Sequence, residues 1–515
     1  MIPARPLVVA LVALAASLPF ARHSNPVRDD KALLAAPPGA GEAFGTDWWG
    51  GRAGSSGLYR PVARTLDGVL ARDWGLGARG QKAASAVLHA AASVLVLPLS
   101  SALSLSASGS LAAALLFAAH PVHAEVFGEI AGRAEVLAAL FSIVALLGVL
   151  RGRILGAAGA GVAALLACLS KESALALPGV AVLLAGRAGW RRSLPGVAAI
   201  AAAAAAALAL RAAVLGSPLG LDPAGVPVVD NPVAALSYLE GRRFALAVLA
   251  HAGAMLLFPI RLSADYSLGA IEAPGSWGDP RVLAGLAIAI GAALAAVRAA
   301  RRTSAAGAFG AAAALVAYLP ASQLPLSIGA LFGERFLYFP SAFAAIAAGA
   351  ILPWRRGGRV AGAALAAIVF LFLTRGALRS ADFASDLDLY RAAETDRPGG
   401  ARAPAAIAHE LNSAGLLGEA LASVDRSLAI CPRWPTALSL RGAILMGLGR
   451  KAESADVFRA AVEATGGGDF AAWWNYAAAL RAIGDRDGAI GAYEEAMRLD
   501  PRERARCEAA IRSLR

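Results

Sequence analysis

The sequence contains little charge for its length. Asp, Glu, Lys and Arg make up only 16% of the 515 residues, whereas hydrophobic residues make up 58%. Soluble domains contain about 25% charged residues. So few polar side chains cannot cover the apolar ones. The composition therefore excludes an ordinary soluble globular protein and predicts a chain that lipid surrounds over much of its surface.

Cysteine and the short motifs of soluble enzymes are also scarce. The three cysteines are Cys168, Cys431 and Cys507, and their spacing matches neither a zinc site nor a disulfide framework. The sequence lacks a Walker loop, a glycine fingerprint after a strand and the HExxH pattern. A catalytic site in this chain therefore has to be assembled from separate segments.

Apolar runs are abundant. Those long enough to cross a membrane as helices, some of them short or tilted, lie at 6–21, 82–100, 103–119, 134–150, 154–169, 173–187, 194–214, 281–297, 306–320, 336–352 and 359–376. The first run is either a cleavable signal peptide or a span, and the charged residues after it favour a retained span. The run 244–260 is ambiguous, and we expect it to be re-entrant or interfacial.

Arginine clusters between these runs set the expected orientation. Much of the net charge of +12 lies at 151–153, 187–192, 298–302 and 355–359. Such clusters are typical of cytoplasmic loops, so the charge indicates membrane topology and not nucleic-acid binding. We expect about eleven spans, a cytoplasmic N-terminus and a tail on the outer, periplasmic side of a bacterial inner membrane.

The tail repeats itself. Val424, Phe458 and Tyr493 occupy equivalent positions at spacings of 34 and 35 residues, and the small residues Ala420 and Ser454 precede two of them by four. This is the tetratricopeptide period, in which small residues allow paired helices to approach closely. The repeats are expected to bind a polypeptide; the alternative is a plain helical cap.

The expected fold is therefore all-α, with two parts. A polytopic transmembrane domain at 1–376 includes outer loops at 22–81 and 215–280, and a linker at 377–404 leads to an α-solenoid of about three tetratricopeptide repeats at 405–515.

Four polar clusters lie at the outer ends of the expected spans, where function is the usual reason for polar groups. The first begins with Asp29 and Asp30 after the first run and continues to Asp47 and Arg60. Adjacent carboxylates close to a membrane face can supply a general base. The alternative is a solvated pair that opens a loop.

The second cluster contains two histidines and several acids. His120, His123 and Glu125 have a spacing that permits metal ligation, sugar binding or a hydrogen-bond network between spans, and Arg133 and Glu135 follow.

The third and fourth clusters pair a cation with an acid. Lys171 and Glu172 lie at the start of one span, and Glu334 and Arg335 lie at the start of another, shortly before Tyr338. An arginine beside an acid at this position is a candidate phosphate clamp; a snorkelling side chain is the alternative.

Taken in order, these segments resemble the transmembrane and tetratricopeptide-repeat O-mannosyltransferases and their bacterial relatives. The resemblance runs from about residue 22 to the end. It rests on the ordered set Asp29-Asp30, Asp47-Trp48-Trp49-Gly50, Tyr59-Arg60-Pro61, His120-Pro121-Val122-His123-Ala124-Glu125, Gly132-Arg133-Ala134-Glu135, Lys171-Glu172, Asp230-Asn231-Pro232 and Glu334-Arg335-Phe336-Leu337-Tyr338-Phe339-Pro340-Ser341.

The resemblance implies an inverting glycosyltransferase of the GT-C type, which moves mannose or another hexose from a polyprenyl-phosphate donor to a hydroxyl, with protein Ser or Thr as one acceptor. It places the acidic pair Asp29-Asp30 at the catalytic centre. Family members usually have an aromatic residue before the pair, where this chain has Arg28.

The remaining candidates have expected roles in binding. The donor phosphate is expected to meet Arg335, helped by Arg60, Arg133 or Lys171. Sugar or acceptor contacts are expected from Asp47, His120, His123, Glu125, Glu135, Glu172, Glu334 and Tyr338. The sequence leaves open whether His120, His123 and Glu125 bind a divalent metal. The rival functions are a transporter and a non-catalytic membrane scaffold with a protein-binding tail.

Overall fold

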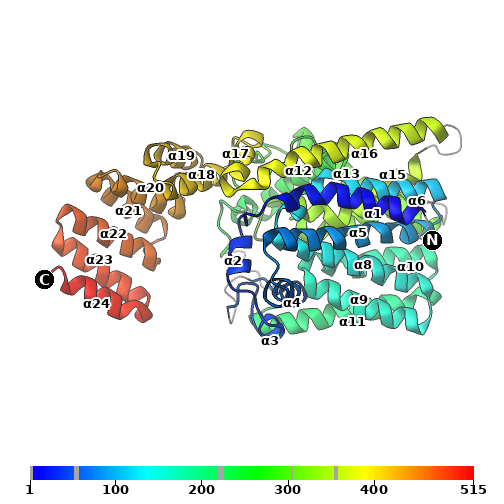
Figure 1. The fold of residues 1–515 in the computed structure, drawn as a ribbon, viewed down its shortest axis with the longest axis horizontal. Coiled ribbons are helices and arrows are strands. Elements are labelled where there is room, and N and C mark those ends of the chain that lie inside the picture. Colours follow the sequence, from blue (N-terminus) through cyan, green and yellow to red (C-terminus); the bar gives the residue numbers. More distant parts are fainter. Residues whose placement is uncertain (1–3, 52–56, 219–224, 303–304, 353–357) are drawn as a thin grey trace. The chain divides into compact units, whose positions relative to one another are not determined.

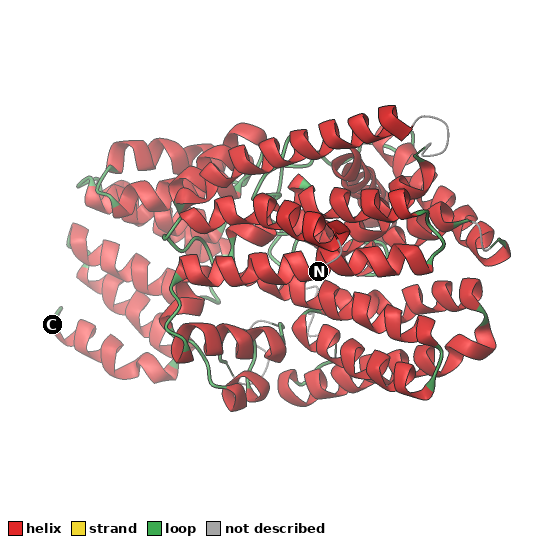
Figure 2. Cartoon of the chain, turned by 45° about the vertical axis from the view of Figure 1, so that its right-hand side comes forward, coloured by secondary structure: helices red, strands yellow, loops and turns green. Residues whose placement is uncertain are grey.

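The computed structural model describes residues 4–51, 57–218, 225–302, 305–352 and 358–515. Within these ranges the chain is helical and contains no strand (Figure 2). The one bridge of β type joins Leu268 and Ile271 in a loop. The expected all-α class is confirmed. The chain divides into two compact units, each of which is described separately.

The first unit comprises 1–227, 233–264 and 273–385 and holds the apolar helices (Figure 1). Its helices are α1 (Ala4–Ser17), α2 (Asp30–Ala35), α3 (Ala40–Gly45), α4 (Pro61–Gly68), α5 (Ala78–Ala102), α6 (Ala107–Ala119), α7 (Ala124–Gly128), α8 (Arg133–Arg151), α9 (Ile154–Ser170), α10 (Leu177–Ala188), α11 (Trp190–Leu215), α12 (Tyr238–Leu257), α13 (Pro280–Arg301), α14 (Ala306–Tyr318), α15 (Tyr338–Ile351) and α16 (Gly358–Ser380).

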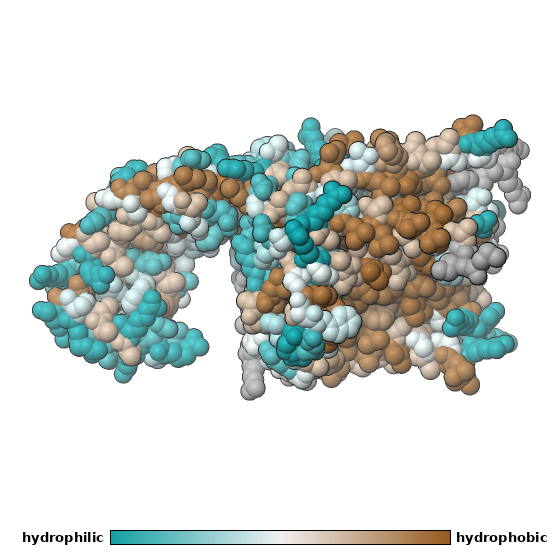
Figure 3. All heavy atoms as spheres, in the orientation of Figure 1, coloured by the Kyte–Doolittle hydropathy of each residue, from teal (hydrophilic) through white to brown (hydrophobic). Residues whose placement is uncertain are grey.

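Every expected apolar run contains a helix. Seven helical segments of the described chain are long and apolar enough to cross a membrane, and α9 and α14 form shorter apolar segments. Helices α10 and α15 have only 12 and 14 residues. The face of the bundle seen in Figure 3 is mainly hydrophobic, shown in brown, as lipid contact requires. The chain is thus an integral membrane protein, and the count of eleven spans stays a prediction.

The expected cytoplasmic clusters gather at one end of the bundle. The Arg192 guanidinium donates to the Arg151 carbonyl at 3.3 Å. Arg187 donates to the carbonyls of Leu103 (2.7 Å) and Arg302 (3.3 Å). The turn after α5 carries no cation of its own, so Arg187 supplies one. This grouping fits the expected topology; residues 355–357 lie outside the described ranges.

Helices in the bundle approach closely where one of them has glycine. A Cβ atom at Gly285 of α13 would overlap the Leu246 carbonyl of α12, and one at Gly310 of α14 would lie 2.6 Å from the Phe343 carbonyl of α15. Small residues let neighbouring backbones meet where lipid supplies no hydrophobic drive for association. Substituting either glycine would separate its helix pair.

The ambiguous run 244–260 forms most of α12. This helix begins at a capping box of Ser237 and Glu240, and its first turns also carry Arg242 and Arg243. It is absent from the long apolar segments of the described chain because these charges lower its hydropathy. Its expected re-entrant or interfacial position stays a prediction.

The second unit comprises 228–232, 265–272 and 386–515. Its helices are α17 (Asp386–Asp396), α18 (Arg402–Ser413), α19 (Leu417–Ile430), α20 (Pro435–Gly447), α21 (Lys451–Ala464), α22 (Phe470–Ile483), α23 (Arg486–Leu499) and α24 (Arg504–Arg512). The second helices of three successive pairs begin at Leu417, Lys451 and Arg486, 34 and 35 residues apart. Hydrophilic residues cover much of this unit's surface (Figure 3).

Packing within the pairs follows the expected repeat register. The small side chains at Ala420, Ser454 and Ala489 are fully buried. A Cβ atom at Gly442 of α20 would lie 2.8 Å from the Phe458 ring of α21, and the Ser454 hydroxyl donates to the Gly442 carbonyl at 2.7 Å. The tail is therefore a tetratricopeptide-like solenoid.

The segment 377–404, expected as a linker, is largely helical. Helix α16 continues to Ser380, and α17 follows over Asp386–Asp396 because Leu389 and Ala393, one turn apart, are fully buried. Helix α18 begins at Arg402, three residues before the expected boundary at 405.

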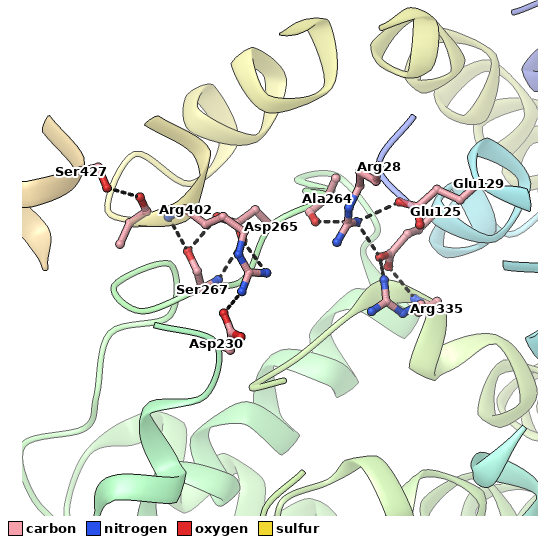
Figure 4. Close-up of polar contacts among 11 residues, drawn as sticks. Arg28, Glu125, Glu129, Asp230, Ala264, Asp265, Ser267, Arg335, Arg402 and Ser427 are labelled. Carbon is pink, nitrogen blue, oxygen red and sulfur yellow. Dashed lines mark hydrogen bonds and ion pairs between the residues drawn. The ribbon is translucent and has the colours of Figure 1, made fainter. Parts of the chain in front are cut away.

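Pieces of the second outer loop also belong to the repeat unit. The Leu268 carbonyl accepts from the Ala401 N–H at 2.9 Å. The Ser267 hydroxyl accepts from the Arg402 N–H at 3.0 Å, and the Arg402 guanidinium pairs with Asp230 (Figure 4). The segment Asp230-Asn231-Pro232 thus contributes to the start of the solenoid.

Candidate functional site

An ion-pair network joins three of the four polar clusters in the membrane unit. The Arg28 guanidinium lies 2.8 Å from a Glu129 carboxylate oxygen and 3.4 Å from Glu125. Arg335 pairs with the same Glu125 oxygen, and its backbone N–H donates to the other oxygen at 3.0 Å. Figure 4 shows both guanidinium groups converging on Glu125. The two acids are 3% exposed, so the network satisfies buried charges.

Local backbone geometry determines the direction of the Arg28 and Arg335 side chains. Arg28 has a φ of 50°, in the left-handed region that non-glycine residues seldom adopt. This residue turns the chain immediately before α2, and its side chain reaches α7 and the Ala264 carbonyl (3.2 Å). Arg335 lies in the short helical turn that precedes α15. Both cations therefore sit on segments that enter or leave spans.

The acidic pair separates into one exposed and one buried side chain. Asp29 is exposed, and its charge acts on both Glu129 and Arg335. Asp30 is fully buried, and one oxygen accepts from the N–H groups of Ile130 (2.7 Å) and Ala131 (3.2 Å). Asp30 therefore fixes the turn before α8, while Asp29 faces outward beside the network.

The pKa of Asp30, the buried member of the pair, is shifted. Burial, with the charge of Glu129, raises the pKa of Asp30 to about 7, although the two backbone donors and the charge of Lys82 oppose the shift. The Asp30 carboxyl therefore titrates near neutral pH.

Lys171 and Glu135 form a second pair. The ammonium lies 2.8 Å from one Glu135 oxygen, and the Ser173 hydroxyl donates to the other at 3.0 Å. Burial lowers the pKa of Lys171 to about 8, because the Glu135 charge offsets only part of the desolvation. The ammonium and the Arg335 guanidinium lie 5.9 and 5.4 Å from the centre of the Phe336 ring. This ring therefore joins the second pair to the first network.

Glu172 holds a third group of charges together. Its two oxygens lie 2.9 Å from Arg60 and 3.0 Å from Arg211. Burial would raise the pKa of Glu172, but the two guanidinium groups lower it to about 2. The Arg60 guanidinium also lies 5.2 Å from the centre of the Trp48 ring. Electrostatic interactions of Lys171 with both Arg60 and Arg335 connect this group to the others.

Other candidate residues have interactions that separate them from the network. Arg133 is fully buried, pairs with Asp67, and donates to Ser85 (3.1 Å) and the Gln81 carbonyl (2.8 Å). Because no part of its side chain is accessible, the structure does not present it to a donor phosphate.

Three more candidates contact the protein's own groups. One Asp47 oxygen accepts from the N–H groups of Trp49 (2.9 Å) and Gly51 (2.7 Å), which holds a turn. A Glu334 oxygen accepts from the Ser263 N–H at 2.5 Å. The Tyr338 hydroxyl lies 2.8 Å from the ring of His89. These contacts hold segments of the membrane unit in place.

The histidines do not converge with Glu125 on a metal position. The His120 ring nitrogens contact the Leu256 carbonyl (3.1 Å) and the Val122 N–H (3.2 Å). His123 contacts the Ser341 hydroxyl at 2.8 Å and packs in an aromatic cluster. Within the described ranges, no three His, Cys, Asp or Glu side chains are arranged to hold a metal ion. These donors do not fit a metal site, and no step is assigned to one.

Sequence reasoning missed several charged members of this region. Arg211 lies within the apolar run 194–214, Lys82 begins the run 82–100, and Asp67 lies in the first outer loop. A charge inside an apolar segment usually faces the protein interior and has a partner or a function. That rule, applied to single residues, would have marked Arg211 and Lys82, whereas Asp67 carries no such signal.

No family model matches the chain. It is 25% identical over 410 residues to the protein O-mannosyl-transferase F38B6.6 of Caenorhabditis elegans. This match covers 76% of this chain and 57% of that protein. It is 26% identical over 443 residues to TMTC4 of Homo sapiens, which covers 72% of this chain and 58% of that protein. A shorter match, to TMTC2 of Mus musculus, has 32% identity over 127 residues and covers 24% of this chain and 15% of that protein. Both TMTC proteins are named protein O-mannosyl-transferases.

The likeness to the solved structure of MamA is weak. MamA has 18% identity and a TM-score of 0.24, and covers 26% of this chain and 77% of its own. At this TM-score the likeness carries no conclusion. The chain spans 57–58% of the length of the first two relatives it matches. The expected resemblance is nevertheless confirmed, because the chain is similar over about three quarters of its length to proteins named protein O-mannosyl-transferases.

Proposed function

We propose that this protein is a membrane glycosyltransferase. It moves a hexose, with mannose as the first candidate, from a polyprenyl phosphate to a hydroxyl of an acceptor protein at the outer face. The observation that carries the proposal is the network that holds Arg28, Arg335, Lys171 and Arg60 at the ends of several spans, together with an exposed carboxylate, Asp29, whose charge acts on Arg335. The similarity to protein O-mannosyl-transferases supports the same reaction class.

Arg335 is the cation that best fits the donor phosphate. Its side chain is 27% exposed, compared with 15% for Arg28, 13% for Arg60 and 6% for Lys171. Glu125 holds its backbone and guanidinium in place. A guanidinium offers several donors to phosphate oxygens, and a fixed one loses little entropy on binding. Arg28, Lys171 and Arg60 add positive potential.

Asp29 is the residue that best fits a general base. The raised pKa of Asp30 would also suit proton transfer at neutral pH. However, Asp30 has no exposed surface and already holds two backbone N–H groups, so it cannot reach an acceptor. Asp29 is exposed, so its carboxylate is accessible to an acceptor hydroxyl. Asp30 holds the neighbouring turn before α8 and so supports the position of Asp29.

In the proposed reaction, the acceptor oxygen attacks the anomeric carbon while the bond from that carbon to the phosphate oxygen breaks. The acceptor proton passes to Asp29, and the bonding electrons leave with the phosphate, whose charge Arg335 stabilises. Attack opposite the leaving group inverts the anomeric centre. The repeat unit is proposed to bind the acceptor polypeptide, as helical repeats commonly do.

Transfer from a radiolabelled polyprenyl-phosphate mannose to membrane proteins tests the proposal. Membranes with wild-type protein are compared with membranes that carry Asp29→Asn. The matched control is Asp73→Asn, because Asp73 is an exposed acid of the same outer loop that pairs only locally, with Arg72. Label in the wild type and the control but not in Asp29→Asn supports the proposal. No label with any of several hexose donors would overturn it in favour of a scaffold or a transporter.

A further inference from the structure

Two buried polar atoms of opposite charge lie beneath the proposed site without a hydrogen-bond partner. Lys82 of α5 is 2% exposed and Asp30 is fully buried. The Lys82 ammonium nitrogen and the second Asp30 oxygen make no hydrogen bond in the described chain. An unpaired buried charge costs several kcal/mol, so such atoms require a compensating group.

Each atom interacts with the other's charge. Lys82 interacts electrostatically with Asp30 and Glu129. Asp30 interacts with Lys82 and Glu129, and Arg133 interacts with Asp30. Lys82 also interacts electrostatically with His23. Lys82 and Asp30 form no direct ion pair in the described chain, so a bridging polar group is needed to satisfy both atoms, and a water molecule with a partner on each side supplies one.

We propose that Lys82 is a positioning residue that holds Asp30 through a bridging water and thereby keeps the start of α2, with Asp29, at the reaction site. The inference rests on the proposed function for its catalytic consequence, while the link between Lys82 and Asp30 stands on the structure. The bridge leaves the first Asp30 oxygen to accept from Ile130 and Ala131.

This arrangement has a pH signature. The pKa of Asp30 is raised from 3.8 to about 7 by burial and Glu129, so folding favours its protonated form. The folded state therefore binds more protons than the unfolded state, and stability falls as pH rises between these two values. Lys82 opposes this effect. Removing its charge raises the pKa of Asp30 further, which extends the fall in stability to higher pH.

Thermal unfolding of the full chain in detergent, between about pH 5 and pH 9, measures this effect. Lys82→Met is compared with wild type, with Lys82→Arg, and with Lys82→Met in an Asp30→Asn background. Lys31→Met is the matched control, because Lys31 is an exposed lysine next to Asp30 in sequence. We expect an additional decrease in Tm above about pH 7 for Lys82→Met alone. Lys82→Arg should restore the wild-type profile, and in the Asp30→Asn background Lys82→Met should no longer cause the additional decrease.

Parallel Tm profiles of Lys82→Met and wild type would overturn the inference, as would the same additional decrease in the Asp30→Asn background. If Lys82→Met does not fold, Lys82→Gln, which also removes the charge, takes its place in the same comparison. For transfer, we expect Lys82→Met to lower kcat about tenfold or more with little change in the donor KM, and Lys82→Arg to recover it. Absence of transfer by wild-type protein would overturn the proposed function, while the Tm profiles would still decide the role of Lys82.

Discussion

The backbone N–H of Arg335 donates a 3.0 Å hydrogen bond to Glu125, although the two residues are 210 positions apart. The same carboxylate pairs with the Arg335 guanidinium. Glu125 therefore fixes both the start of the turn before α15 and the direction of the cation. A cation held in this way is ready to bind an anion without reorganising.

Arg335→Gln is expected to raise the KM for the polyprenyl-phosphate donor and to lower kcat/KM by about 10- to 100-fold, the value of one or two charge-assisted hydrogen bonds. Arg335→Lys should recover only part of the loss, because lysine keeps the charge but not the planar donors. Arg375→Gln is the control, since the Arg375 guanidinium donates to the Ile260 carbonyl and not to an acid of the network. An unchanged donor KM in Arg335→Gln would assign the phosphate to another cation.

The two members of the acidic pair should respond differently to the same substitution. Asp29→Asn removes the proposed base and is expected to lower kcat by about 10²- to 10⁴-fold with normal Tm. Asp30→Asn keeps an acceptor oxygen for Ile130 and Ala131, so a smaller decrease in kcat is expected. Steady-state transfer and thermal unfolding of both variants measure the difference. A larger loss of kcat in Asp30→Asn would exchange the two roles.

The sequence predicted the elements of this structure better than the pairings among them. Apolar runs and the repeat period depend on local composition, so each expected span contains a helix, and Val424, Phe458 and Tyr493 are buried as the repeat requires. The gathering of the motifs that contain Arg60, Lys171 and Arg335 follows from topology, because all were expected at the same ends of the spans.

The pairings could not be predicted, because they depend on helix rotation and on single backbone turns. A helix that is apolar on all sides gives no periodicity from which to decide that Arg133 faces Asp67. The separation of Asp29 from Asp30 depends on the left-handed conformation of Arg28, and arginine carries no sequence signal for that conformation. Helix α17 was not predicted because its sequence is polar, like that of a linker. It is stabilised by the burial of Leu389 and Ala393, which the sequence does not reveal.

Donor binding should weaken in alkaline solution through Lys171. Burial lowers the pKa of this ammonium to about 8, so it loses its proton above that pH and its attraction for phosphate disappears. The donor KM is therefore expected to rise as pH passes through about 8. In Lys171→Arg the cation stays charged, and the KM should stay flat over the same range. A wild-type KM that is independent of pH up to about 9.5 would remove Lys171 from the donor site.

Substitutions of Arg133 and Asp67 distinguish a structural role of Arg133 from a role in binding the donor phosphate. Both side chains are buried, and removing one member of a buried pair leaves an uncompensated charge, so Arg133→Met is expected to lower the free energy of unfolding by about 3–5 kcal/mol. Replacing Asp67 by Leu in the same chain should restore part of that loss, which a double-mutant cycle of thermal unfolding in detergent measures. If Arg133 instead met the donor phosphate, as the sequence suggested, Arg133→Lys would raise the donor KM and leave the Tm unchanged. The fully buried guanidinium donates to Asp67, Ser85 and the Gln81 carbonyl, which predicts the reverse: a lower Tm and, in the protein that remains folded, an unchanged donor KM.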